Sequence, residues 1–261
     1  MLDGKEVYLG LDVSTKTIGI CLMTDDGSEN GSIIELTHIS PKAPKGIKGT
    51  EELFIKTKMF EDFITQYIGF GVDKVIIEEP LLMSNNANTV ASLLRFNGMV
   101  SHAIYRLFGL VPEYISSYDA RKYSFPDLMA PRKYGKADTT YPREKILKEV
   151  NNGRLTLFGS YPWTIDKKAV IQGKVAELFP SIEWIYGKKG ELKKQNFDAT
   201  DAYVAARGYI NKKRYGELEL KVSDIVESDK FVAYKVSYWD RTEERTTFLP
   251  EKQIEKKEAD D

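Results

Sequence analysis

Four acidic residues occur at three separate places in the chain, each where an apolar segment is interrupted, ends or begins. Asp12 interrupts one apolar run, Glu78 ends another, and Asp198 and Asp201 open an alanine-rich segment. An ionised carboxylate is costly to bury unless it is paired or binds a metal. Several carboxylates at one place also repel one another unless cations hold them together. The four residues therefore predict a divalent metal site.

The ligand types favour Mg²⁺, with Mn²⁺ as the second choice. Carboxylate oxygens suit these ions better than zinc, and the chain has only two histidines, His38 and His102. Two carboxylates from strands and two from one helix could hold two ions about 4 Å apart. Such a pair suits phosphodiester hydrolysis, because one ion lowers the pKa of the attacking water and the other stabilises the leaving 3′ oxygen.

Each acidic residue also has a purely structural explanation. Asp12 could accept hydrogen bonds from the polar turn that follows it. Glu78 and Glu79 could be exposed acids entering a loop. The side-chain period of two in a strand lets only one of this pair face a site, and we favour Glu78. Asp198 could be a helix N-cap and Asp201 the acid of a capping box, which is compatible with metal binding.

The elements that position these residues follow from the spacing of apolar side chains. Residues 6–39 read as three strands, over 7–13, 17–23 and 32–39, and two more strands are expected over 73–78 and 113–117. Helical spacing predicts helices over 50–68, 88–108, 167–179 and 198–212. Strands that alternate with helices after an N-terminal meander indicate an α/β domain with a mixed sheet.

Two segments lie outside this pattern. Residues 125–163 have weak periodicity and many Pro, Gly, Lys and Tyr residues, which is typical of a functional or disordered loop. From residue 218 onward, three strands are expected over 218–226, 230–239 and 244–249. We therefore predict one domain over 1–215, with a basic insertion at about 125–165, and a small β-rich extension over 216–261.

The composition is ordinary for a soluble protein of 261 residues, with 42% hydrophobic and 30% charged residues. No apolar run approaches the roughly 20 residues that span a bilayer, and the N-terminus lacks a signal-peptide pattern. The single cysteine, Cys21, excludes an intramolecular disulfide and a cysteine-rich zinc module. We expect a cytoplasmic protein with no membrane partner.

The charge is distributed unevenly along the chain. Residues 120–214 contain 20 Lys and Arg against 10 Asp and Glu, a net charge of +10. The remainder carries −11, because the whole chain carries −1. A basic middle suggests one face that binds a polyanion, although a solvated lysine-rich surface would give the same count.

Three motifs together resemble the RuvC-type Holliday junction resolvases of the RNase H-like superfamily. They are residues 10–19 around Asp12, residues 75–78 ending in Glu78, and residues 198–202 with the last two aspartates. Residues 86–98 resemble the helix that follows the second acidic strand of that family. Residues 166–172 resemble the segment that carries its active-site lysine, which would be Lys168. The resemblance covers about residues 6–123 and 166–210.

The resemblance implies an RNase H-like fold, a mixed five-stranded sheet flanked by helices. It also implies a homodimer, two Mg²⁺ ions per site and paired nicks across a four-way DNA junction. The catalytic residues would be the four carboxylates and Lys168. Residues 125–163 and 218–261 have no counterpart in compact bacterial members, and they resemble additions in phage or viral members, which act in the host-cell cytoplasm.

Several basic residues are candidates for contacts to DNA phosphates. They are Lys168 and, as further candidates, Lys122, Lys167, Arg132 and Lys133. Bacterial members of the family carry an aromatic wedge three residues after the strand glutamate. Here that position is Leu81.

Other functions are consistent with parts of the pattern. Residues 9–17 also resemble the phosphate-binding hairpin of actin-like and sugar-kinase phosphotransferases, which need a second nucleotide-binding half with its own glycine-rich loop. We find no such loop in the sequence. A nonenzymatic DNA-binding module would not need the complete set of carboxylates. A nuclease that acts on flaps, forks or RNA–DNA hybrids would retain them.

Overall fold

The computed structural model describes residues 4–80, 86–131, 143–157, 166–193 and 196–249. The chain divides into two compact units. Unit 1 comprises residues 1–124 and 166–216, and unit 2 comprises residues 125–165 and 217–261. The segment expected as an insertion is thus grouped with the C-terminal segment, while the division at residue 215 into independent domains stays a prediction. Among the described helices, none has the length and apolar character needed to cross a membrane.

Unit 1 is built on a five-stranded sheet with the order β3-β2-β1-β4-β5. The strands are β1 (Val7–Val13), β2 (Ile18–Thr24), β3 (Ser32–Ile39), β4 (Lys74–Glu78) and β5 (Glu113–Ile115). The first three form an antiparallel meander, and β4 runs parallel to both β1 and β5. The predicted mixed five-stranded α/β sheet is confirmed.

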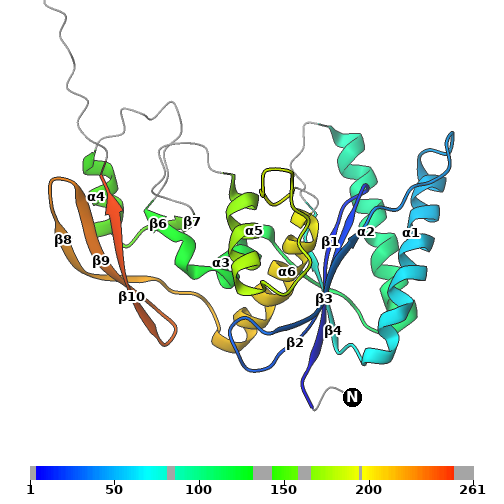
Figure 1. The fold of residues 1–261 in the computed structure, drawn as a ribbon, viewed down its shortest axis with the longest axis horizontal. Helices are drawn as coiled ribbons and strands as arrows, with labels where there is room; N and C mark the ends of the chain where they lie inside the picture. Colours follow the sequence, from blue (N-terminus) through cyan, green and yellow to red (C-terminus); the bar gives the residue numbers. More distant parts are fainter. Residues whose placement is uncertain (1–3, 81–85, 132–142, 158–165, 194–195, 250–261) are drawn as a thin grey trace, which may run out of the picture. The chain divides into compact units, whose positions relative to one another are not determined.

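Helices cover both faces of this sheet (Figure 1). One face carries α1 (Thr50–Ile64), which continues as a 3₁₀ turn (Thr65–Phe70), and α2 (Ala87–Phe108). The other face carries α6 (Asn196–Tyr215), against which α3 (Ser117–Ser124) and α5 (Lys167–Leu178) pack. The four predicted helices are confirmed. The short α3 was not predicted, because most of its eight residues are polar.

The pleat of β1 separates the main core from the acidic residue. Leu9, Leu11 and Val13 are buried in the core formed with α1 and α2. Gly10 and Asp12 alternate with them and so lie on the opposite face, which α6 covers. The period of two in this strand therefore directs the carboxylate away from the apolar core and toward the helix.

The helix α6 approaches the sheet closely because two strand positions lack a side chain. A Cβ at Gly10 would lie 2.3 Å from the carbonyl oxygen of Ala202, and one at Gly19 would lie 1.8 Å from that of Asp198. Gly19 is the cross-strand partner of Asp12. The first turn of α6 is thus in backbone contact with the sheet directly beside Asp12.

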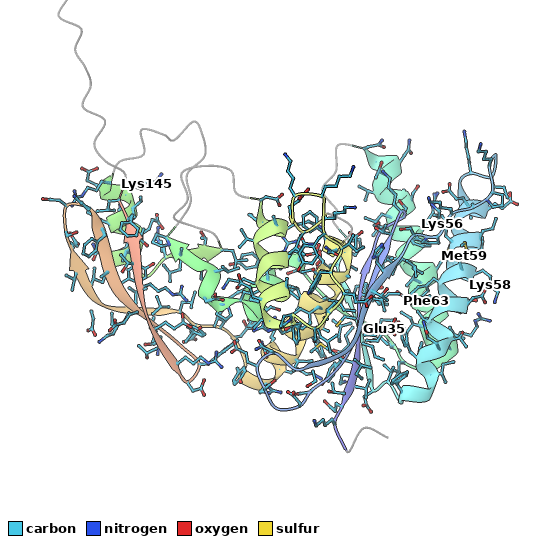
Figure 2. All side chains as sticks on the ribbon, viewed as in Figure 1. Glu35, Lys56, Lys58, Met59, Phe63 and Lys145 are labelled. Atoms are coloured by element: carbon cyan, nitrogen blue, oxygen red, sulfur yellow. The ribbon has the colours of Figure 1, made fainter. Side chains whose placement is uncertain are left out.

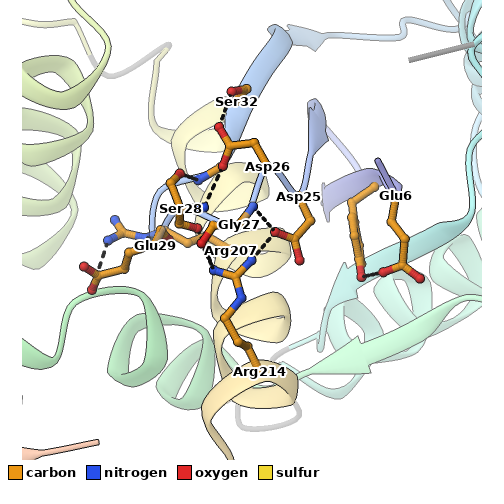
Figure 3. Close-up of polar contacts among 11 residues, drawn as sticks. Glu6, Asp25, Asp26, Gly27, Ser28, Glu29, Ser32, Arg207 and Arg214 are labelled. Carbon is orange, nitrogen blue, oxygen red and sulfur yellow. Dashed lines mark hydrogen bonds and ion pairs between the residues drawn. The ribbon is translucent and has the colours of Figure 1, made fainter. Parts of the chain in front are cut away.

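Two arginines fix the other half of α6 to the turn between β2 and β3 (Figure 3). Arg214 donates to the carbonyl oxygens of Gly27 and Ser28 over 3.1 and 2.7 Å and pairs with Asp25. Arg207 donates to the carbonyl oxygen of Glu29 over 3.3 Å. These contacts, together with the close packing at the glycines, hold the helix along its length.

On the opposite face of the sheet, a buried lysine of α1 contacts the turn between β1 and β2. Lys56 on α1, labelled in Figure 2, is 8% exposed. Its Nζ donates to the carbonyl oxygen of Thr15 over 2.7 Å and pairs with Glu52 over 2.6 Å. Helix α1 therefore holds the β1–β2 turn that follows Asp12.

Unit 2 contains a three-stranded antiparallel sheet of β8 (Lys221–Glu227), β9 (Phe231–Tyr238) and β10 (Arg241–Phe248), which confirms the predicted C-terminal strands. The segment before residue 166 adds a 3₁₀ turn (Pro126–Leu128), β6 (Met129–Pro131), α4 (Arg143–Asn151) and β7 (Leu155–Leu157). Side chains join the two segments. Arg143 donates to the carbonyl oxygens of Ser228 and Asp229, and Arg245 donates to those of Pro126 and Met129.

Candidate functional site

The sheet brings Asp12 and Glu78 together at the carboxyl ends of two neighbouring parallel strands. Gly10 pairs with Ile76 and Leu11 with Ile77, so the next positions along β1 and β4 are the two acids. Ile77 packs in the core with Leu11, which places Glu78 on the face that α6 covers. Sites in open α/β sheets commonly form at this end of the strands.

Helix α6 supplies the other two carboxylates from its first turns. Asp198 lies beside Gly19, and its Oδ2 accepts a hydrogen bond of 2.6 Å from Thr17 Oγ1. Asp201 is 2% exposed. Because α6 already begins at Asn196, Asp198 lies inside the helix and not at its N-cap. The structure therefore places all four predicted acidic residues at this end of the sheet, where Asp12 lies close enough to Glu78, Asp198 and Asp201 to repel each of them.

Two basic side chains face the buried Asp201. Lys168 Nζ, from α5, lies 2.5 Å from Asp201 Oδ2. Arg121, from α3, places a terminal nitrogen 3.6 Å from Asp201 Oδ1. A carboxylate this deeply buried needs such partners. Arg121 was missed in the sequence, where Lys122 beside it was the candidate, and no spacing signal connects it to Asp201.

Burial and crowding make the two strand acids hard to ionise. Burial, followed by repulsion from Asp201, raises the pKa of Asp12 from 3.8 to about 7, against the attraction of Lys168. Burial, followed by repulsion from Asp12 and Asp201, raises the pKa of Glu78 from 4.5 to about 8. Near neutral pH the site therefore holds protons where a cation could replace them.

The charge of Lys168 is in turn stabilised by the carboxylates. Burial opposes its positive charge, but attraction to Asp201 and then to Asp12 and Glu78 outweighs that cost and raises its pKa. Lys168 thus stays charged and supplies part of the positive charge that the carboxylates require.

The structure does not show the purely structural roles that the sequence left open for Asp12 and Glu78. The β1–β2 turn is closed by Ser14, whose Oγ accepts from the amides of Lys16 and Thr17. Asp12 is not needed for that role. Glu79 is exposed and lines a separate cavity of about 440 Å³ together with Glu113 and other residues.

The remaining candidates for DNA contact have different positions. Lys122 lies on α3 with its Nζ 5.1 Å from the centre of the Tyr123 ring. Lys167 is the first residue of α5, next to Lys168. Arg132, Lys133 and Leu81 lie outside the described residues.

The donor set fits a hard divalent cation in its chemistry. All four acids offer oxygen ligands, and Glu78 Oε2 is buried without a hydrogen-bond partner. Within the described residues, however, no group of three or more His, Cys, Asp or Glu side chains is arranged to hold a metal ion. The described arrangement instead uses Lys168 and Arg121 as its cations. Metal binding would require Asp201 to exchange its ion pair with Lys168 for the metal.

Comparisons with known proteins identify similar folds only. No protein-family model matches the sequence, and no curated protein sequence matches it significantly. RuvC from Thermus thermophilus, solved in complex with a Holliday junction substrate, is 10% identical with a TM-score of 0.46, and the match covers 80% of this chain and 96% of that chain.

Two further solved structures are similar to smaller degrees. The yeast mitochondrial Holliday junction resolvase Ydc2 is 14% identical with a TM-score of 0.36, over 81% of this chain and 83% of that chain. A Ppx/GppA family member from Aquifex aeolicus is 11% identical with a TM-score of 0.35, over 80% of this chain and 89% of that chain. Because all three TM-scores are below 0.5, any assignment of function rests on the site and on the sequence motifs.

Proposed function

We propose that this protein is a metal-dependent endonuclease that cleaves phosphodiester bonds in branched DNA, with the four-way junction as its substrate. The observation that carries the proposal is the meeting of four carboxylates, from two strands and one helix, with two basic side chains at the carboxyl ends of β1 and β4. The junction as substrate rests on the resemblance of the sequence motifs to RuvC-type resolvases.

The proposed roles follow from the contacts in the site. Asp12, Glu78, Asp198 and Asp201 would hold two Mg²⁺ ions, or Mn²⁺ in their place. When bound, these ions supply an acidified water and charge stabilisation for phosphodiester hydrolysis. Lys168, released from Asp201, binds and orients a non-bridging oxygen of the scissile phosphate.

Two further contacts position the carboxylates. Arg121 remains beside Asp201 and limits the repulsion between the acids, since it lowers the pKa of both Asp12 and Glu78. Thr17 orients Asp198 through its hydrogen bond. Because Glu78 has a raised pKa and Oε2 is unpartnered, metal binding near neutral pH should release a proton from this side chain.

We also propose that the active form is a homodimer. Two nicks across a four-way junction require two sites, and a two-fold symmetric pair of subunits supplies them. Light scattering of the full chain, with and without junction DNA, would measure this. A monomer both with and without junction DNA would refute the dimer but would leave the proposed metal-dependent cleavage untested by this result.

A cleavage panel tests the activity. Four-way junction, flap, fork, linear duplex and RNA–DNA hybrid substrates are each incubated with the full chain and Mg²⁺ or Mn²⁺. We expect nicking of the junction that a chelator abolishes. Asp12→Asn should abolish nicking while it leaves junction binding largely intact, and Glu79→Gln, the neighbouring acid outside the site, should nick normally.

Two outcomes would contradict the proposal. Undiminished nicking by Asp12→Asn would show that the carboxylates do not carry the reaction. Binding of ATP in a calorimetric titration, without nicking of any substrate, would favour the phosphotransferase alternative that the β1–β2 motif also resembles.

A further inference from the structure

Residues 185–193, just before α6, form a short hairpin. Tyr186 and Leu192 form an antiparallel bridge. The amide of Lys193 donates to the carbonyl oxygen of Ile185 over 2.9 Å, and the amide of Gly187 donates to that of Glu191 over 2.7 Å. The segment therefore has a defined backbone and is not an irregular connection between helices.

Two lysines occupy the tip of this hairpin. The amide of Gly190 donates to the carbonyl oxygen of Gly187 over 3.1 Å, and Gly190 has a φ of 80°. A turn followed by a left-handed glycine is a common three-residue hairpin loop. Its loop residues here are Lys188, Lys189 and Gly190, and both lysines are exposed.

The single acid of the hairpin is used to shape the loop. Glu191 Oε2 accepts from the amide of Lys189 over 3.1 Å. The same carboxylate lies over Gly187, where a Cβ would be 2.2 Å from Oε1. A side chain at position 187 would displace this carboxylate. With Lys188, Lys189 and Lys193 against this one acid, the hairpin carries a net charge of +2.

Buried amide side chains attach the base of the hairpin to the candidate site. Asn196, the first residue of α6 and 5% exposed, accepts from the amide of Ile185 over 3.1 Å and donates to its carbonyl oxygen over 2.9 Å. Gln172 on α5, 1% exposed, donates to the carbonyl oxygen of Lys193 over 3.0 Å. Figure 1 shows this loop beside α5 and the start of α6.

These attachments fix the hairpin to the two helices that carry site residues. Asn196 is two positions before Asp198 on α6, and Gln172 is one helical turn after Lys168 on α5. Each hairpin arm, 185–187 and 191–193, has three residues and reaches about 10 Å. That length matches about three nucleotides of a B-form strand, at about 3.4 Å per nucleotide.

We propose that the 185–193 hairpin is a clamp for the nucleic-acid backbone. In this clamp, Lys188 and Lys189 bind phosphates of the strand that enters the candidate site. The proposal rests on the proposed nuclease function and specifies one surface that holds the substrate. Lysine ammonium groups on a rigid loop bind phosphates without reading the bases, so the clamp would fix the position of the strand and not its sequence.

Salt dependence of binding provides the test. The double variant Lys188→Ala/Lys189→Ala is compared with Lys5→Ala/Lys213→Ala. This control removes the same charge from two exposed lysines, one just before β1 and one near the end of α6. Both pairs are made in an Asp12→Asn background, so that the DNA is not cut. Junction affinity is measured by fluorescence anisotropy between 50 and 200 mM KCl.

We expect the hairpin variant to reduce the slope of log K against log salt by about 1.8, since each phosphate contact contributes about 0.9. The advantage of the parent protein over the variant should then shrink about tenfold from 50 to 200 mM salt. The control pair should leave the slope unchanged, and Lys188→Arg/Lys189→Arg should restore it because arginine also binds phosphate.

Equal slopes for the hairpin variant and the control pair would overturn the clamp. So would a hairpin variant that lowers affinity by the same factor at every salt concentration, since that behaviour indicates a structural effect. These results are independent of catalysis. If the wild-type protein, which retains Asp12, fails to nick any substrate, the nuclease function is rejected. The slopes of the binding measurements would still decide whether the hairpin binds phosphates.

Discussion

In the metal-free protein, replacing Asp12 with asparagine should change the free energy of unfolding relative to the wild type, and the variant should gain more relative stability at alkaline pH than at acidic pH. The carboxylate of Asp12 is destabilised by burial and by Asp201, which raises its pKa to about 7. A native state with a raised acid pKa binds a proton that the unfolded state has lost. The stability from that proton is full below the unfolded pKa of about 3.9 and is lost as the pH rises through the folded pKa.

The magnitude follows from the pH window. Between pH 5 and the raised pKa of about 7, the native state keeps the proton of Asp12 while the unfolded chain does not. Two pH units at about 1.36 kcal/mol each give about 3 kcal/mol that the wild type loses relative to Asp12→Asn between pH 5 and pH 8.5. Relief of Glu78, whose pKa Asp12 also raises, acts in the same direction.

Chemical denaturation in EDTA at pH 5 and pH 8.5 measures this difference. The control is Asp26→Asn, because hydrogen bonds from Ser28 and Ser32 lower the pKa of Asp26 to about 2. Its folded pKa is below the unfolded value, so its stabilisation is present at both test pH values and the variant should be less stable at both. Saturating Mg²⁺ should then stabilise the wild type more than Asp12→Asn.

A pH-independent difference between wild type and Asp12→Asn would refute this reasoning. It would show that Asp12 ionises freely in the folded protein and that the carboxylates do not crowd one another. A lower stability of Asp12→Asn at both pH values, as for the Asp26 control, would indicate that the Asp12 carboxylate makes stabilising structural hydrogen bonds.

Three further predictions concern the surroundings of the acids. Gly19→Ala should destabilise the protein by about 3 kcal/mol or more in denaturation, because its Cβ would meet the backbone of Asp198, whereas Gly98→Ala, in open space on α2, should stabilise it by about 0.5–1 kcal/mol. Lys168→Met should lower the free energy of unfolding in EDTA by about 1 kcal/mol, because Asp201 loses its ammonium partner. For the same reason the variant should bind Mg²⁺ more tightly in calorimetry. Unchanged Mg²⁺ affinity would contradict the competition between Lys168 and the metal for Asp201. Arg121→Gln should raise the pKa of Asp12 and Glu78 further, so that Mg²⁺ binding at pH 7.5 releases more protons. Calorimetry in buffers of different ionisation enthalpy measures this release. Equal proton release by variant and wild type would count against a role for Arg121.

Much of unit 1 could be predicted because its signals are local. The apolar runs of β1, β2 and β4 mark strands buried on both faces, and the helices have regular apolar spacing. The same periodicity separates Glu78 from Glu79, since consecutive strand residues point to opposite faces. The structure places Glu78 on the α6 face and Glu79 at a separate cavity.

The rest depends on contacts that no local pattern encodes. Arg121 lies on a short polar helix, and only the packing of α3 on α6 brings it to Asp201. The elements between residues 125 and 165 were read as a loop because β6 and β7 have three residues each and, among the described strands, pair only with each other. Their contacts with the C-terminal segment are made by side chains such as Arg245. The ion pair between Lys168 and Asp201 likewise follows from the packing of α5 against α6.

The two units are interleaved along the chain, and this affects how the protein can be made. The chain passes between them after residues 124, 165 and 216. During synthesis, β1 and β4 emerge early, but the carboxylates of α6 follow only after the whole first segment of unit 2 has left the ribosome. A truncation at residue 216 would therefore keep every candidate catalytic residue but remove the C-terminal segment that Arg143 and Asn151 contact.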